Sequence, residues 1–315
     1  MVERLQAAAR WAPKLIELAS SGIKPDAIKR LSKVAAVTAE NRRSARAVAE
    51  LFFGVSMEVD LREAVSRRIY LSGSFEQPLS LFLYRYLKPG MTFLDVGAHF
   101  GYFSILAASR VGEEGRVVAM EPTPETFTIL SRNLSGFPFA EPYQAGAWKT
   151  SGTLQLNDFG PAFSAFNSVA GIRLGPQAGV ARKQLIEVPV WSLDEFSAAH
   201  DIHPDVVKID VESAEREVLQ GMDGVLRGAR PIVSVEVGDF QHLIKQGVAP
   251  SRVFLNHLKS RNYILFEPKM EGLRRHILKT TPDAYTYDNI LGVPAEKVPS
   301  LIELRADQPA LQPVQ

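Results

Sequence analysis

Cysteine is absent from the 315-residue sequence, which excludes disulfides and cysteine-ligated zinc sites. The chain also has no apolar run of about 18 residues, the length that predicts a membrane-spanning helix. The first twenty residues contain interspersed charges, at Glu3, Arg4, Arg10, Lys14 and Glu17. Such spacing is not typical of a secretory signal peptide. We therefore expect no stable membrane insertion and a cytoplasmic location.

The sequence also lacks an excess of positive or negative charge. Lys and Arg number 36 against 35 Asp and Glu, and the isoelectric point is near 7.9. Nucleic-acid binders usually carry a strong basic excess, so we expect no nucleic-acid partner. Residues 1–50 hold ten Lys and Arg against five Asp and Glu. Such a local excess is typical of the solvated side of a helical segment, although it also suits an anionic surface.

Three regions follow from the local composition. Residues 1–55 have apolar side chains at helical spacing and are interpreted as a helical extension, through which a homo-oligomer could form. Residues 56–300 form the main domain, and 301–315 a loosely held tail. Within the domain, residues 157–184 are rich in Gly, Pro and Ser without a clear period, which favours an insertion or lid over a plain connection.

Alternating strand and helix patterns dominate the main domain. A short strand is predicted at 67–71 and a helix at 77–87. Regular alternation then starts, with strands expected near 91–96, 116–120, 143–148, 152–156, 186–190, 206–211, 232–237, 263–267 and 287–293. Alternation of this kind builds an α/β fold, here a doubly wound, mostly parallel seven-stranded sheet with helices on both faces.

The segment FLDVGAHFGYFS, residues 93–104, joins an apolar strand to an amphipathic helix. Asp95, Gly97 and Gly101 lie at the turn, the place where open parallel sheets bind ligands. A dinucleotide site needs Gly-x-Gly-x-x-Gly, whereas Phe100 occupies a position that such a turn gives to a small residue. The spacing indicates a nucleoside without a pyrophosphate, as in S-adenosylmethionine.

Glu121 strengthens the interpretation as a nucleoside site. It ends the next strand, VVAMEP, 20 residues after Gly101. A carboxylate in that place can accept hydrogen bonds from both ribose hydroxyls. Pro122 and the helix cap Thr123 follow, so the side chain lies at the carboxyl edge of the sheet.

A third motif, DVVKIDVESAEREVLQGM, covers residues 205–222. Lys208, Asp210 and Glu212 alternate with apolar residues, which places the three on one face of a strand. Charges on a buried parallel strand are either paired or functional. Both interpretations stay open: an ion cluster that stabilises the fold, or acids facing the methyl group to be transferred.

The segments DVGAHFGYFS, AMEPTPETF and KIDVESAEREVLQGM together resemble the FkbM family of class I S-adenosylmethionine-dependent methyltransferases. The resemblance covers roughly residues 70–270 and includes SGSFEQP at 72–78 and AGAWKTSG at 145–152. The family usually has Asn where His99 stands and Gly where Ser213 stands. It implies S-adenosylmethionine as cofactor and O-methylation of a hydroxyl on a sugar, glycoconjugate or secondary metabolite.

We expect two sets of site residues. The cofactor site comprises Asp95, Gly97, Ala98, Gly101, Tyr102, Glu121, Pro122, Ala147, Trp148 and Asp210. Candidates for the base that activates the hydroxyl are Asp210, Glu212, His99 and Glu236. No metal ligand is assigned, although Asp239 and His242 could join Asp210 and Glu236 around a divalent ion that acidifies the hydroxyl.

Two other classes of function remain open. A nicotinamide-dependent oxidoreductase is disfavoured by the missing middle glycine at the turn. A nucleoside-binding module without catalysis is disfavoured by the acids at positions 210, 212 and 236. The acceptor, a small molecule or glycan, is not defined by the sequence.

Overall fold

A computed structural model describes residues 30–31, 33–34, 45–167, 184–239, 250–279, 285–286 and 288–303. Several sequence predictions fall outside these ranges. They are most of the N-terminal helical extension, the middle of the 157–184 insertion, His242 and the C-terminal tail after residue 303. Within the described ranges, no helix is both long enough and apolar enough to cross a membrane.

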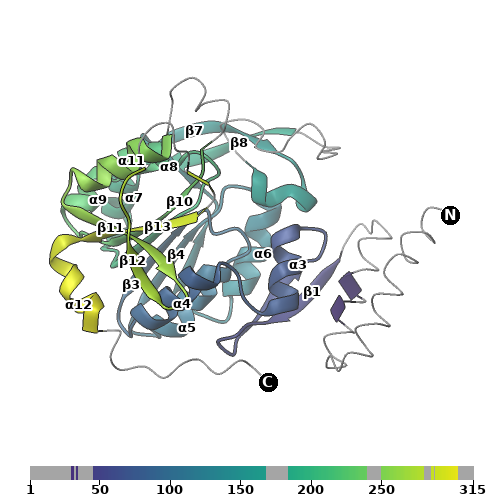
Figure 1. The fold of residues 1–315 in the computed structure, drawn as a ribbon. Helices are drawn as coiled ribbons and strands as arrows, with labels where there is room; N and C mark the ends of the chain where they lie inside the picture. Colours follow the sequence, from purple (N-terminus) through teal and green to yellow (C-terminus); the bar gives the residue numbers. More distant parts are fainter. Residues whose placement is uncertain are drawn as a thin grey trace.

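One large sheet organises the domain (Figure 1). Its eight strands, in spatial order, are β12 (Gly272–Arg275), β11 (Tyr263–Lys269), β13 (Asp288–Pro294), β10 (Ile232–Val237), β9 (Val206–Ile209), β3 (Thr92–Val96), β4 (Arg116–Met120) and β5 (Ala140–Tyr143). Strands β10, β9, β3, β4 and β5 pair in parallel, and the three others pair antiparallel. The α/β class and the mostly parallel sheet are thus confirmed, with eight strands rather than seven.

Both faces of the sheet are buried, because successive side chains of a strand point to opposite faces. Phe93, Val117 and Val206 belong to one apolar cluster, and their neighbours Leu94, Val118 and Val207 to the other. The first cluster includes α3 (Ala64–Ser72), α4 (Gln77–Tyr86), α5 (Tyr102–Val111), α6 (Pro124–Leu134) and part of α12 (Val298–Glu303). The second includes α7 (Leu193–His200), α8 (Glu215–Gln220), α9 (Asp223–Arg227) and α11 (Pro250–Lys259).

Two small sheets are added to this core. A hairpin of β1 (Arg46–Glu50) and β2 (Ser56–Asp60) contacts α3 and α6. A second sheet, in the order β6-β8-β7, comprises Gly146–Ala147, Gln184–Trp191 and Gly152–Asp158. The 3-10 helix η1 (Pro161–Phe166) follows β7 and contacts α3 and α6, and η2 (Ala295–Lys297) precedes α12.

The structure corrects two local predictions. Residues 67–71 were predicted as a strand but lie in α3, whose N-cap Glu63 accepts hydrogen bonds from the backbone N–H groups of Val65 and Ser66. Helical structure was predicted through residue 55, but Arg46–Glu50 form a strand with alternating buried and exposed side chains. In both segments long-range pairing or a cap outweighs local propensity.

Candidate functional site

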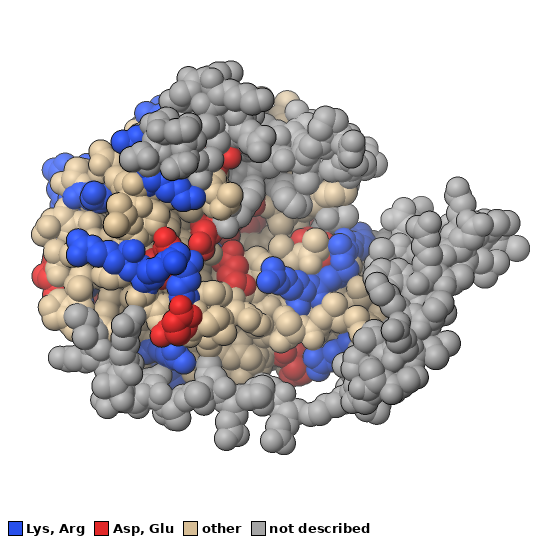
Figure 2. Space-filling model, in the orientation of Figure 1, with Lys and Arg blue, Asp and Glu red and all other residues tan. Residues whose placement is uncertain are grey.

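A deep cavity opens at the carboxyl ends of β3, β4, β9 and β10, where an open parallel sheet is expected to bind ligands. The cavity has a volume of about 270 Å³, just below the about 300–1,000 Å³ of typical small-molecule sites. Figure 2 shows Asp and Glu side chains inside the central hollow of the molecule.

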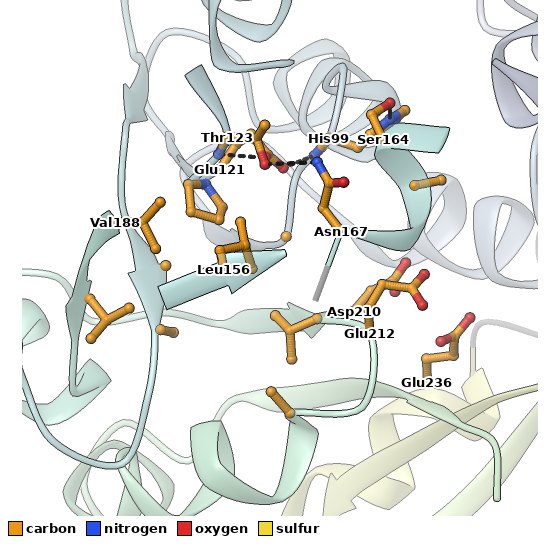
Figure 3. A pocket seen from close by; sticks show the side chains of 18 of the residues that line it. His99, Glu121, Thr123, Leu156, Ser164, Asn167, Val188, Asp210, Glu212 and Glu236 are labelled. Carbon is orange, nitrogen blue, oxygen red and sulfur yellow. Dashed lines mark hydrogen bonds between the residues drawn. The ribbon is translucent and has the colours of Figure 1, made fainter. Parts of the chain in front are cut away.

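Glu121 lies at one end of this cavity, just after β4 (Figure 3). Its Oε2 accepts a hydrogen bond from the backbone N–H of His99 at 3.1 Å, and its Oε1 accepts one from that of Thr123 at 2.9 Å. Burial raises the pKa of Glu121 to about 7, although these hydrogen bonds favour the ionised form. The carboxylate is thus fixed in orientation and retains lone pairs for a ligand.

The glycines of the turn after β3 are needed for packing, because a side chain at either position would collide with neighbouring atoms. Gly97 has a φ of 79°, and an added Cβ would lie 1.8 Å from the backbone oxygen of Asp210. Gly101 has a φ of 90°, and its Cβ would lie 2.7 Å from Leu130 on α6. Gly97 lets β3 and β9 end side by side, and Gly101 lets α5 pack on α6.

The same turn uses its own N–H groups internally. The N–H groups of Gly97 and Ala98 bond to the Met120 oxygen, and that of Gly101 bonds to the Ala98 oxygen. The N–H of His99 donates to Glu121. A pyrophosphate needs free N–H groups at this point, so the turn fits a nucleoside better than a dinucleotide.

Apolar side chains form the wall next to Glu121. They come from the small sheet and the loop after β4, and comprise Pro122, Ala147, Trp148, Leu154, Leu156, Val188 and Val190. Figure 3 shows Leu156 and Val188 on this side, away from the carboxylates at the opposite end. A flat aromatic base would find here the apolar contacts that ligand pockets usually supply.

Carboxylates gather at the opposite end. Asp210 and Glu212 follow β9, Glu236 lies near the end of β10, and Glu76 precedes α4. In Figure 3 the side chains of Asp210, Glu212 and Glu236 lie close together in the same part of the cavity. Burial and the neighbouring Asp210 raise the pKa of Glu76 to about 7.

Lys208 lies behind the acidic end, fully buried. Its Nζ is 3.1 Å from Asp210 Oδ2 and 3.9 Å from Asp95 Oδ1, and 4.9 Å from the ring centre of Phe103. Burial alone would lower the pKa of Lys208, but Asp210 and Asp95 raise it above its usual value. The lysine is therefore charged and holds Asp210 at the cavity edge.

His99 lines the cavity next to Glu121. Its backbone is left-handed, with a φ of 51°, and its ring stacks on Phe100. Its Nε2 is 2.9 Å from the hydroxyl of Ser164 in η1, and nearby Asn167 donates to the Thr123 hydroxyl at 3.2 Å. Burial lowers the pKa of His99, which makes it a weak base. These two bonds hold the described part of the insertion against the cavity.

The structure brings together most of the predicted site residues. Lining the cavity are the base candidates His99, Asp210, Glu212 and Glu236, and the cofactor candidates Gly97, Glu121, Pro122, Ala147 and Trp148. Asp95, Ala98, Gly101 and Tyr102 do not line it. Asp95 accepts a hydrogen bond from Ser104, and Tyr102 bonds to Ser80, so both support the turn from behind.

Glu76 also lines the cavity, and the sequence interpretation did not name it. It belongs to SGSFEQP, a segment placed only at the edge of the family resemblance. Its backbone has a φ of 40°, which turns its side chain into the cavity at the start of α4. The Glu-Gln-Pro helix start was a local signal, but its distance of 134 residues from Asp210 hid the link.

Only some of the candidate metal ligands considered from the sequence lie together in the structure. Asp239 is committed elsewhere, because it accepts hydrogen bonds from the backbone N–H groups of Ser251 and Tyr285 at 3.0 Å each. His242 lies outside the described residues. Asp210 and Glu236 remain, and Glu76 joins them.

The fold and cavity define an α/β protein with a nucleoside-type site at its topological switch point. Comparison with known families narrows this class. The profile of the methyltransferase FkbM domain matches residues 95–265, more than half of the chain. The chain belongs to the FkbM family of class I S-adenosylmethionine-dependent methyltransferases, as its motifs indicated.

Other similarities are more limited. The profile of protein-L-isoaspartate(D-aspartate) O-methyltransferase matches residues 32–138. Hexuronic acid methyltransferase AglP of Haloferax volcanii is 29% identical over 147 residues, which are 46% of this chain and 55% of that protein. Protein-L-isoaspartate O-methyltransferase 1 of Arabidopsis thaliana is 27% identical, over 55% of this chain and 79% of that protein. The chain thus spans about half the length of the first of these relatives.

Among solved structures, a methyltransferase FkbM from Methylobacillus flagellatus KT aligns with a TM-score of 0.40 at 15% identity. The alignment covers 90% of this chain and 58% of that one. The family assignment rests on the sequence profile rather than on this alignment.

Proposed function

We propose that the protein transfers the methyl group of S-adenosylmethionine to a hydroxyl of a sugar, glycoconjugate or related small molecule. The observation that carries the proposal is the two-ended cavity, with the fixed carboxylate Glu121 at one end and Asp210, Glu212 and Glu236 at the other. The bound cofactor supplies a methyl group on a sulfonium, which is transferred by an in-line displacement.

The first end suits the nucleoside of that cofactor. Glu121 accepts the ribose hydroxyls, and the adenine packs against the apolar wall around Pro122 and Trp148. Because the cofactor carries positive charge on its sulfonium and its ammonium group, an acidic cavity favours its binding. The proposed domain that provides this site runs from the β1–β2 hairpin to about residue 300.

The second end suits a hydroxyl acceptor. Carboxylates accept hydrogen bonds from hydroxyl groups and can take the proton that the acceptor loses, which is typically worth about 10²–10⁴-fold in rate. Glu212 is the proposed base, because His99 bonds to Ser164 and has a lowered pKa, and Asp210 is paired with Lys208. An anionic carboxylate acceptor would be repelled by the same acidic residues.

The relatives differ in the acceptor that their names give. AglP is named for a hexuronic acid, a sugar with hydroxyl and carboxyl groups, whereas the isoaspartate enzymes are named for O-methylation of protein isoaspartate. The match to the isoaspartate profile ends at residue 138, before Asp210, Glu212 and Glu236. We favour a sugar hydroxyl because these acids would repel an isoaspartyl carboxylate.

An assay with radiolabelled S-adenosylmethionine separates these acceptors. We expect label to pass to hydroxyl-bearing glycans and not to an isoaspartyl peptide. The product should resist mild alkali, because a methyl ether is stable there and a methyl ester is hydrolysed. Alkali-labile label, or label on the isoaspartyl peptide alone, would contradict the proposal.

A further inference from the structure

Three carboxylates that are distant in sequence meet at the acidic end of the cavity. Glu76 comes from the start of α4, Asp210 from the loop after β9 and Glu236 from β10. One oxygen from each can be chosen so that all three lie within 4.8 Å of one another. Like charges this close repel one another, so a compensating cation or proton is required.

A second observation concerns the Oε2 atom of Glu76. This oxygen is shielded from solvent and has no hydrogen-bond partner within the described part of the chain. The side chain of Asn289, the residue that pairs with Glu236 across β10 and β13, lowers the pKa of this carboxyl group and so favours its ionised form. A buried acceptor without a donor is costly, so its orientation into the cavity points to a missing ligand.

Two basic residues act on this cluster. Lys208 is shared between Asp210 and Asp95. Arg68 acts on Glu76 as well, but it is exposed, and solvent screens its charge.

We propose that Glu76, Asp210 and Glu236 bind a divalent cation, Mg²⁺ or Mn²⁺. Carboxylate oxygens are the ligands that these hard cations prefer, and three protein ligands leave coordination positions for the acceptor. The role of this cation rests on the function proposed above: it binds the acceptor hydroxyl and lowers its pKa.

The reaction at this site then balances simply. The acceptor oxygen forms a bond to the methyl carbon, the carbon–sulfur bond breaks, and its electron pair stays on sulfur as S-adenosylhomocysteine forms. The hydroxyl proton passes to Glu212, which lines the same end of the cavity but is outside the trio.

Manganese binding tests the site without an acceptor. Titration of the full chain with Mn²⁺, followed by the electron paramagnetic resonance signal of the free ion, should show a single site that Mg²⁺ competes for. Glu76→Gln should weaken Mn²⁺ binding by about 10–100-fold or more. That is the loss seen when a residue that only orients a metal ligand is removed. Glu236→Gln should do the same, which guards against a folding defect in one variant.

Glu121→Gln is the matched control, because it removes a carboxylate from the opposite end of the same cavity. It should keep Mn²⁺ binding and lose affinity for S-adenosylhomocysteine, whereas Glu76→Gln should do the reverse. No Mn²⁺ site in the wild-type chain, or unchanged Mn²⁺ binding in both Glu76→Gln and Glu236→Gln, would overturn the proposal. If Glu76→Gln instead weakens S-adenosylhomocysteine and not Mn²⁺, the acids neutralise the cofactor, and the metal site is wrong. Mn²⁺ binding without S-adenosylhomocysteine binding would refute the proposed function but keep the metal site.

Discussion

At the residue scale, Glu121 links the fold to the site. Its two oxygens accept hydrogen bonds from the backbone N–H groups of His99 and Thr123, so the turn after β3 and the start of α6 both depend on its position. The side chain is nevertheless buried, which disfavours its charge. Such a carboxylate is favoured as an anion only when a ligand adds further donors.

We predict a pH-dependent cost of this burial in the free protein. The pKa of Glu121 is raised to about 7 from its usual 4.5. Between these values the folded chain holds a proton that the unfolded chain has released. The free energy of unfolding should therefore fall as pH rises through this window, by roughly 3 kcal/mol in total. Urea unfolding at pH 5 and pH 8 measures it.

Glu121→Gln is the comparison for this experiment. Glu76, whose pKa is also raised, titrates in both chains, and its contribution cancels in the difference. The variant should lose less stability between pH 5 and pH 8 than the wild-type chain. Identical pH dependence of the two chains would show that Glu121 is not the group responsible.

A second prediction concerns Lys208. Lys208→Met leaves Asp95, of which 1% is exposed, without its cation, so we expect a loss of about 3–5 kcal/mol in the free energy of unfolding. Asp210→Asn should cost less, because Asp210 is 22% exposed and Lys208 keeps Asp95. It should instead abolish methyl transfer. Equal destabilisation by the two variants, measured by urea unfolding, would contradict this account.

At the scale of elements, the close approach of the turn after β3 to the end of β9 fixes the site. We predict that Gly97→Ala is more destabilising than Gly112→Ala. Both glycines have positive φ, 79° and 65°, so both variants bear a backbone strain of about 1–3 kcal/mol. Only at Gly97 would the new Cβ collide, with the backbone of Asp210, whereas Gly112 has open space.

Urea unfolding of both variants measures this difference. Gly97→Ala should also weaken binding of S-adenosylhomocysteine, since Asp210 and the turn must move apart. Gly112 lies at the far end of α5 and should leave binding unchanged. Equal stability and equal binding in the two variants would show that the close approach of these two strand ends does not determine the site.

The elements show what the sequence could predict. Strands at the centre of the sheet carry near-continuous apolar runs followed by Asp95, Glu121 or Asp210, so their positions and the site at their ends were predictable. The β1 strand, RAVAE, has three apolar residues in a row and no alternation in its sequence, so only its pairing with β2 makes it a strand.

The rest of the site depends on long-range contacts. Glu76 reaches Asp210 and Glu236 through a left-handed backbone at the start of α4, and its separation in sequence from both residues hides this contact. The apolar wall joins Leu154 and Leu156 of β7 to Val188 and Val190 of β8, across the insertion. Pairing across such a distance cannot be read from periodicity alone.

At the scale of the whole molecule, the segment after β7 closes one side of the cavity. The bonds His99–Ser164 and Asn167–Thr123 connect it to the two loops that carry the cofactor site. We predict that amide hydrogen exchange in residues 159–167 slows when S-adenosylhomocysteine binds, because the ligand orders both loops. Exchange in α11, on the opposite side of the sheet, serves as the reference and should not change.

Mass spectrometry of the exchanged protein measures this effect. Protection of 159–167 that is already complete in the free protein, and equal with saturating ligand, would show that the segment is a fixed wall and not a cover.

The N-terminal boundary of the domain is a separate proposal. Because Ala47, Ala49 and Leu51 are buried with Met57 and Val59, we place the start of the domain near residue 45 rather than at 56.

Calorimetric titration with S-adenosylhomocysteine tests the central claim most directly. The wild-type chain should bind it in the micromolar range and should not bind NAD. Glu121→Ala should weaken binding by about 10- to 100-fold, the value of hydrogen bonds to a charged group. Absence of binding to the wild-type chain, equal binding of NAD, or unchanged affinity in Glu121→Ala would contradict the assignment of this cavity to the methyl donor.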